Sequence, residues 1–278
     1  MFSRRKTELL SDDDLIKEAI DIVSKASEKG IILRILGAVA VRIHSSHSPE
    51  ALELYERVSR IDCSKSQFTD LDLIGYSSQK KQIAEFFEKD LGFRIYPQVK
   101  VLLGGRRFIY NHSKDYYSVD IFFDKLEYSH TIYFGEKPNT AKSRLELDFP
   151  TITLTDLVLE KLQIHDIAMK DIIDLIILFT SHEVSEDEEK EKINGKYVAT
   201  ILADDWGFWY DATNNLKLVE EYAARLINEK TITKSQTFLM NNIERMKLLI
   251  DNQPKTKNWE KRARIGTSKE WYRKVETL

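Results

Sequence analysis

The chain has 278 residues, of which 42% are hydrophobic and 31% are charged, and its formal net charge is −3. This length allows one large domain or two ordinary ones with a buried core, and the small negative charge argues against a surface coated for nucleic-acid binding. No apolar stretch is long enough to span a bilayer and the N-terminus lacks an apolar signal-peptide core, so we expect a cytoplasmic protein with no membrane partner. The single cysteine, Cys63, excludes an intrachain disulfide.

Helices and strands alternate in the first part of the chain. Ser11 and the three aspartates after it form a helix start, and apolar residues continue at helical spacing until Gly30. Residues 31–36 predict a short buried strand that leads into Gly37, and a helix follows. We then expect a strand over residues 70–76 and an amphipathic helix over residues 80–92.

The next stretch is rich in strand residues. Residues 93–103 and 107–111 flank Gly104-Gly105, which is typical of a hairpin turn. Further strands are expected over residues 116–124, 128–134 and 144–149.

The pattern becomes helical from Thr155 onward. Residues 182–192 are acidic and polar and predict a solvated loop. The predicted helices cover residues 154–165, 168–179, 214–229 and 234–251. The layout therefore predicts an α+β fold, with an N-terminal helix (1–30), an α/β domain with a mixed β-sheet flanked by helices (31–150) and a helical C-terminal domain (151–278).

Two carboxylates share one face of the strand expected over residues 70–76. Successive side chains of a strand point to opposite faces, so Asp70 and Asp72 project together while Leu71 and Leu73 face the core. Carboxylates placed in this way repel each other unless a cation or hydrogen-bond donors lie between them. A later predicted strand carries a third carboxylate, Asp120, and we expect this strand to be a neighbour of the one that carries Asp70 and Asp72. Three such groups can hold one or two Mg²⁺ ions.

The order of strand, Gly37-Ala38, helix, Asp70-x-Asp72 strand and Asp120 strand resembles a nucleotidyltransferase domain of the DNA polymerase beta superfamily. The resemblance implies a nucleotidyltransferase-like sheet followed by a helical region, a Mg²⁺ cofactor and an NTP substrate. It also implies that Asp70, Asp72 and Asp120 are catalytic residues and metal ligands, and that Gly37 and Ala38 contact the nucleotide phosphates. The usual turn is Gly-Gly or Gly-Ser, so a phosphate contact of that kind is missing here.

The segment "LTDLVLEKLQIHDIAMKDIIDL" (154–175) resembles the lysine and "KDxxDL" helical segment of AbiEii-type toxins within that superfamily. On this resemblance Lys161 and Asp174 belong to the nucleotide site. Asp171 and Asp174 stack on one helix face, and an ion-pair role for them is equally open.

The activity implied by these resemblances is transfer of NMP from an NTP to an acceptor hydroxyl, on tRNA or on a small molecule. The chain is then a candidate toxin of a toxin–antitoxin system, with a protein antitoxin as partner. The alternative is a catalytically inactive domain of the same fold that serves as a binding protein. The aromatic residues at positions 206–210 can stack a base but more often anchor a loop, and the basic tail from Lys255 is either solvated or an RNA contact.

Overall fold

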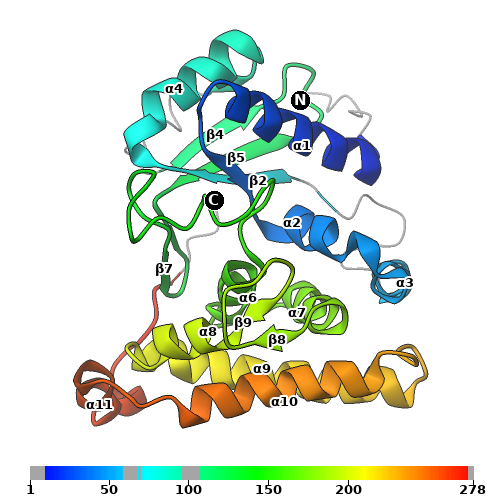
Figure 1. Ribbon diagram of the computed structural model, residues 1–278, viewed down its shortest axis with the longest axis vertical. Helices are drawn as coiled ribbons and strands as arrows, with labels where there is room; N and C mark the ends of the chain where they lie inside the picture. Colours follow the sequence, from blue (N-terminus) through cyan, green and yellow to red (C-terminus); the bar gives the residue numbers. More distant parts are fainter. Residues whose placement is uncertain (1–9, 59–67, 69, 96–106, 275–278) are drawn as a thin grey trace, which may run out of the picture. The chain divides into compact units, whose positions relative to one another are not determined.

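The computed structural model describes residues 10–58, 68, 70–95 and 107–274 (Figure 1). The chain divides into two compact units. The described residues of the first unit lie within Met1–Ile43, Ile61–Lys125 and Tyr133–Ile152, and those of the second within His44–Arg60, Leu126–Ile132 and Thr153–Leu278. Both units are therefore assembled from separate stretches of chain that interleave along the sequence.

The first unit is built on a mixed five-stranded sheet with the strand order β1-β2-β5-β4-β3. The neighbours β2 and β5 run parallel, and the other neighbouring pairs run antiparallel. Figure 1 shows β2, β5 and β4 side by side. The bounds are β1 Leu33–Ile35, β2 Asp70–Gly75, β3 Arg94–Ile95, β4 Arg107–Asn111 and β5 Ser118–Phe123. The predicted α+β class with a mixed sheet is confirmed, whereas the hairpin turn expected at Gly104-Gly105 lies outside the described residues.

One face of this sheet is apolar because apolar residues alternate with polar ones over residues 70–73 of β2 and 118–121 of β5. Leu71 and Leu73 on β2 and Val119 and Ile121 on β5 are all fully buried. The side chain of Ile83 lies close to Gly75 on the same face. Ile83 belongs to helix α4 (Lys80–Glu85), which continues as one π-helical segment, Phe86–Asp90.

Helix α1 (Asp12–Glu28) begins where the sequence predicts. The hydroxyl oxygen of Ser11 accepts a hydrogen bond from the backbone N–H of Asp14, which satisfies one of the four unpaired donors at the helix start. The apolar face of α1 is buried, and the helix packs against β1.

The strand predicted over residues 144–149 is wrong. The backbone N–H of Leu145 donates to the hydroxyl oxygen of Tyr76 at 3.1 Å, and that of Leu147 closes a turn onto the carbonyl of Arg144. The Tyr76 hydroxyl in turn donates to Glu146. The side chain of a buried tyrosine thus makes a hydrogen bond to this segment that a neighbouring strand would otherwise provide. Of the strand predicted over residues 128–134, only β7 (Thr131–Tyr133) forms, paired with β6 (Lys125–Glu127).

The second unit is mainly helical, which confirms the predicted helical C-terminal region. Helices α9 and α10 lie side by side (Figure 1), and α7 is buried along almost its whole length. None of the helices in the described ranges is long and apolar enough to cross a membrane. The bounds are α3 Pro49–Val58, α6 Leu154–Leu162, α7 Met169–Ser181, α8 Gly195–Leu202, α9 Trp206–Asn228, α10 Gln236–Asn252 and α11 Lys257–Ala263.

Two segments of the second unit differ from the sequence prediction. Helix α9 starts eight residues earlier than expected, because the Asp205 side chain accepts a hydrogen bond from the N–H of Phe208 at 3.0 Å and so caps the helix. The aromatic residues after Asp205 therefore form the first turns of α9, where Trp206 and Phe208 are buried. Within the expected loop over residues 182–192, Val184–Ser185 (β8) is buried and pairs with Ile193–Asn194 (β9).

Candidate metal centre

The three predicted acidic residues lie together on one face of the sheet. The parallel register of β2 and β5 pairs Asp72 with Asp120 and Asp70 with Ser118, so all three carboxylates project from the face opposite the apolar one. Their ligand oxygens lie within 4.8 Å of one another. The prediction that the strands carrying these residues are neighbours is confirmed. We call Asp70, Asp72 and Asp120 the acidic trio.

The acidic trio is graded in exposure. Asp70 is exposed, Asp72 is half-buried, and Asp120 is 8% exposed. Burial raises the pKa of Asp120, the nearby Arg107 guanidinium opposes this rise, and the charge of Asp70 adds to it. The protein thus holds like charges together in a partly desolvated place. Repulsion between these carboxylates lowers the stability of the protein, and a bound metal cation would offset that repulsion.

Gly37 lies against the carboxylate of Asp72. Its φ is +71°, a left-handed conformation, and a Cβ added at this position would lie 2.8 Å from Asp72 Oδ2. The backbone N–H of Leu36 donates to the carbonyl of Asp72 at 3.1 Å, which fixes this turn to β2. Helix α2 (Gly37–His44) starts here, with Ala38 in its first turn, so the positive end of its dipole lies beside Asp72.

A basic residue that sequence reasoning missed completes this surface. Arg107 on β4 forms an ion pair with Asp120, and its guanidinium carbon lies 5.0 Å from the centre of the Phe122 ring. Register explains the contact, because Arg107 pairs with Phe122, two residues beyond Asp120 on the same face of β5. The sequence offers no signal for it without the register of β4 against β5.

The donor set of the acidic trio suits a hard divalent cation. Mg²⁺ prefers carboxylate oxygens and usually keeps water and substrate oxygens as its other ligands. Three carboxylates within 4.8 Å of one another, one of them exposed, provide such ligands and leave access from solvent. Asp70, Asp72 and Asp120 therefore fit the Mg²⁺ expected from the sequence.

Lys161 and Asp174 lie in the second unit, in a buried ionic cluster. Lys161 Nζ is 3.1 Å from a carboxylate oxygen of Asp171, 3.1 Å from one of Asp174 and 3.5 Å from one of Glu160. The side chains of these four residues are at most 7% exposed. The "KDxxDL" segment thus brings together the lysine and the two aspartates that the resemblance singles out. Their expected role toward a nucleotide stays a prediction.

Three histidines of the second unit, His44, His47 and His182, lie close together. The ring of His182 lies 5.1 Å from that of His47 and 6.1 Å from that of His44, centre to centre. His182 Nδ1 lies 3.2 Å from the carbonyl oxygen of Glu191, an acceptor, so Nδ1 carries the proton. Burial lowers the pKa of His182 to about 4. The imidazole of His182 is therefore neutral at physiological pH.

A buried aspartate joins three parts of the second unit. Asp211 on α9 accepts hydrogen bonds from His130 at 2.8 Å, from His165 at 2.9 Å and from the Trp271 indole at 3.0 Å. Burial alone raises the pKa of Asp211, but these hydrogen bonds outweigh it and hold the pKa below its usual range. The cluster fixes the segment around Trp271 to α9.

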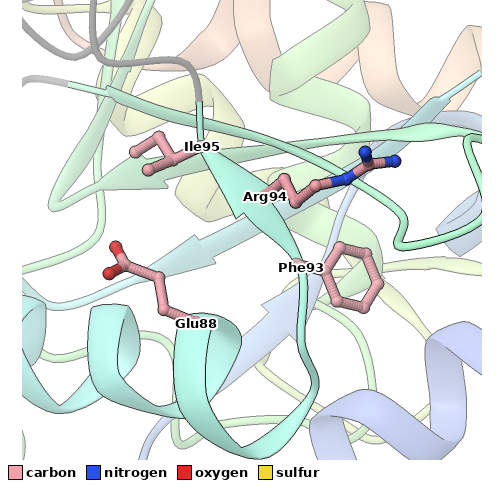
Figure 2. Close-up of a pocket in the computed structure, with 4 residues that line it drawn as sticks. All are labelled: Glu88, Phe93, Arg94 and Ile95. Carbon is pink, nitrogen blue, oxygen red and sulfur yellow. The ribbon is translucent and has the colours of Figure 1, made fainter.

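A pocket of about 400 Å³ opens elsewhere in the first unit, beside β3. Figure 2 shows its lining residues Glu88, Phe93, Arg94 and Ile95, with Glu88 on the π-helical turn and Arg94 and Ile95 on the short strand. The guanidinium of Arg94 is held by Asp115 at 2.7 Å. None of the site residues predicted from the sequence lines this pocket.

No protein-family model, no curated protein and no solved structure matches this chain. The geometry of the acidic trio and its surroundings is therefore what bears on the function of this chain.

Proposed function

We propose that the protein is a metal-dependent nucleotidyltransferase with a domain of the DNA polymerase beta type, which moves NMP from an NTP to an acceptor hydroxyl. The observation that carries this proposal is the acidic trio, held on two parallel neighbouring strands, with Gly37, the first residue of α2, packed against Asp72. An Asp-x-Asp pair alone is common, whereas a third carboxylate in register with it and a glycine turn against it are a more specific combination.

In this proposal the acceptor oxygen attacks the α-phosphorus of the NTP. A new O–P bond forms, the bond between the α-phosphorus and the bridging oxygen breaks, and pyrophosphate leaves. Asp70, Asp72 and Asp120 would hold Mg²⁺, which would neutralise phosphate charge and acidify the acceptor hydroxyl. The backbone N–H groups at the start of α2 face phosphate oxygens, as the N-terminus of a helix can.

Asp120 has one of two roles in this scheme. It would either take the proton of the attacking hydroxyl, or serve only as a metal ligand while water takes that proton. Burial raises the pKa of Asp120 above its usual range, which is the direction that makes a carboxylate a stronger base. Lys161 and Asp174 are proposed to support the nucleotide, as the AbiEii-type resemblance implies.

The acceptor is a hydroxyl of tRNA or of a small molecule. A phosphate-rich acceptor is favoured by the tail from Lys255 to Lys274, where most basic side chains are exposed. With an RNA acceptor, the AbiEii-type resemblance supports a toxin of a toxin–antitoxin system, with a protein antitoxin as partner.

Label transfer tests the proposal directly. The protein is incubated with Mg²⁺, each of the four α-labelled NTPs and total RNA or a panel of small hydroxylated molecules. We expect label to move to one class of acceptor and Asp72→Asn to abolish the transfer. The matched control is Asp115→Asn, an exposed carboxylate in the same unit that is bound to Arg94.

A binding protein without catalytic activity is the alternative, and the ion pair between Asp120 and Arg107 is compatible with it. Mg²⁺ with NTP should raise the melting temperature of an enzyme, since a ligand that binds only the folded state stabilises it. A wild-type protein whose melting temperature does not respond to any Mg²⁺·NTP, and which transfers no label, is not a nucleotidyltransferase.

A further inference from the structure

Arg107 occupies an unusual place for a cation. It is bound to Asp120, which is one of three carboxylates whose oxygens lie within 4.8 Å of one another. A divalent ion held by the acidic trio would have to share Asp120 with the guanidinium, and two cations on one carboxylate repel each other. The pairing seen here and full metal binding therefore compete.

The rest of the guanidinium has capacity for another acceptor. An arginine has five N–H donors, and Arg107 Nε is buried without a hydrogen-bond partner within the part of the chain that the structure describes. The side chain is 27% exposed, so it is neither locked in the core nor freely solvated. The Phe122 ring lies beside the guanidinium and limits its directions of movement.

These observations point to an anion as the second partner of Arg107. Arginine is well suited to phosphate because its planar fork can donate two parallel hydrogen bonds. A triphosphate bound through a metal at the acidic trio brings several negative oxygens to this surface. When the Asp120 carboxylate binds the metal, Arg107 loses its anionic partner. The triphosphate oxygens would then take the place of that carboxylate beside Arg107.

We propose that Arg107 is a phosphate-binding residue of the nucleotide site that exchanges partners, from Asp120 without ligand to the triphosphate with metal–nucleotide bound. This inference rests on the proposed function. It implies that the metal alone binds weakly, because it has to displace Arg107, and that metal and triphosphate bind better together. Arg107 thereby couples the two ligands.

The test compares Arg107→Gln with wild type by calorimetry, using Mn²⁺ alone and then Mg²⁺ with inorganic triphosphate, which needs no knowledge of the preferred base. We expect Arg107→Gln to bind Mn²⁺ more tightly, by about 3-fold or more, because a competing cation is gone. We expect it to bind Mg²⁺·triphosphate more weakly, by about 10-fold or more, because a charge-assisted hydrogen bond is lost. Opposite signs in the two titrations are the specific expectation.

Two further variants keep the result interpretable. Arg107→Lys keeps the charge and should bind Mn²⁺ as wild type does, while losing part of the triphosphate affinity. Arg94→Gln removes an exposed arginine from strand β3 of the same sheet and should change neither titration. If Arg107→Gln weakens Mn²⁺ binding, or binds Mg²⁺·triphosphate as wild type does, the inference is wrong.

A different result would contradict the proposed function itself. Wild type that binds Mn²⁺ but neither Mg²⁺·triphosphate nor any Mg²⁺·NTP would overturn the nucleotidyltransferase proposal and the phosphate role of Arg107 together. Wild type that binds both ligands, with Arg107→Gln indistinguishable from it, would overturn only the role of Arg107.

Discussion

Replacing Gly37 by alanine separates two effects that act at one position. The first is backbone strain, because a residue with a Cβ at a φ of +71° costs about 1–2 kcal/mol relative to glycine. The second is steric. The added Cβ would lie 2.8 Å from Asp72 Oδ2, against an ordinary contact of at least 3.4 Å, so the atoms must separate by about 0.6 Å (3.4 minus 2.8).

The Asp72 carboxylate gives way, because the atoms closest to the new Cβ all belong to its side chain. A displacement of this size is large beside Mg²⁺–oxygen distances of about 2.0–2.1 Å, which tolerate little variation. We expect the affinity for Mg²⁺ or Mn²⁺ to fall by about 10-fold or more, equivalent to about 1.4 kcal/mol.

Gly30→Ala is the matched control. Gly30 has a φ of +73° in the same unit, and a Cβ there would meet nothing within 4 Å. Urea unfolding should show that both variants lose about 1–2 kcal/mol of stability from the backbone alone. Calorimetry should show weaker metal binding only for Gly37→Ala. Equal metal affinities for the two variants would refute the reasoning that Gly37 holds the Asp72 carboxylate in a metal site.

Three further predictions concern the second unit. The pKa of His182 is about 4 in the folded protein and 6.5 in the unfolded chain, so the unfolded chain takes up the proton first as pH falls. The free energy of unfolding should therefore drop by about 2 kcal/mol between pH 7.5 and pH 5. Urea unfolding curves should show a smaller drop for His182→Gln. Asp211→Ala leaves one buried donor, on His130, and two partly buried donors, on His165 and Trp271, without their acceptor. It should cost about 2–3 kcal/mol and change the fluorescence of Trp271. Unchanged stability and fluorescence would contradict the role of Asp211 as a link. Glu50→Gln should cost about 1 kcal/mol of stability in thermal melts. The reason is that the Glu50 carboxylate accepts hydrogen bonds from the backbone N–H groups of Thr233, Lys234 and Ser235, which precede α10. A variant as stable as wild type would show that water can replace the carboxylate.

The part of the candidate site that depends on the alternation of side chains within one strand was predictable from the sequence. The two-residue period of β2 determines that Asp70 and Asp72 share a face and that Leu71 and Leu73 are buried. The proximity of Asp120 followed from an expected strand order. Which residues flank the trio depends on the register between strands, and that register is set by the packing of the whole sheet. Arg107 was missed for this reason.

The alternating pattern gave a wrong prediction at a segment for which the described residues provide no partner strand. Residues 144–149 have the pattern of a strand, but the hydroxyl of Tyr76 binds the backbone at Leu145 instead. The start of α9 was missed for a different reason, since the Asp205 cap precedes a run of aromatic residues with moderate helix propensity whose burial favours the helix. Asp211 and its three donors are separated by 46 to 81 residues along the chain, and no local pattern connects them.

The interleaving of the two units has a consequence for synthesis on the ribosome. Helix α3 belongs to the second unit, yet Glu50 at its start meets its hydrogen-bond partners at Thr233, 183 residues later. At about 5–20 residues per second, the ribosome needs roughly 9–37 seconds to make that stretch. During this time the apolar face of α3, with Ala51, Leu54 and Tyr55, has no finished unit to pack against. The nascent chain should therefore be a client of chaperones that bind short apolar segments until the rest of the second unit has been made.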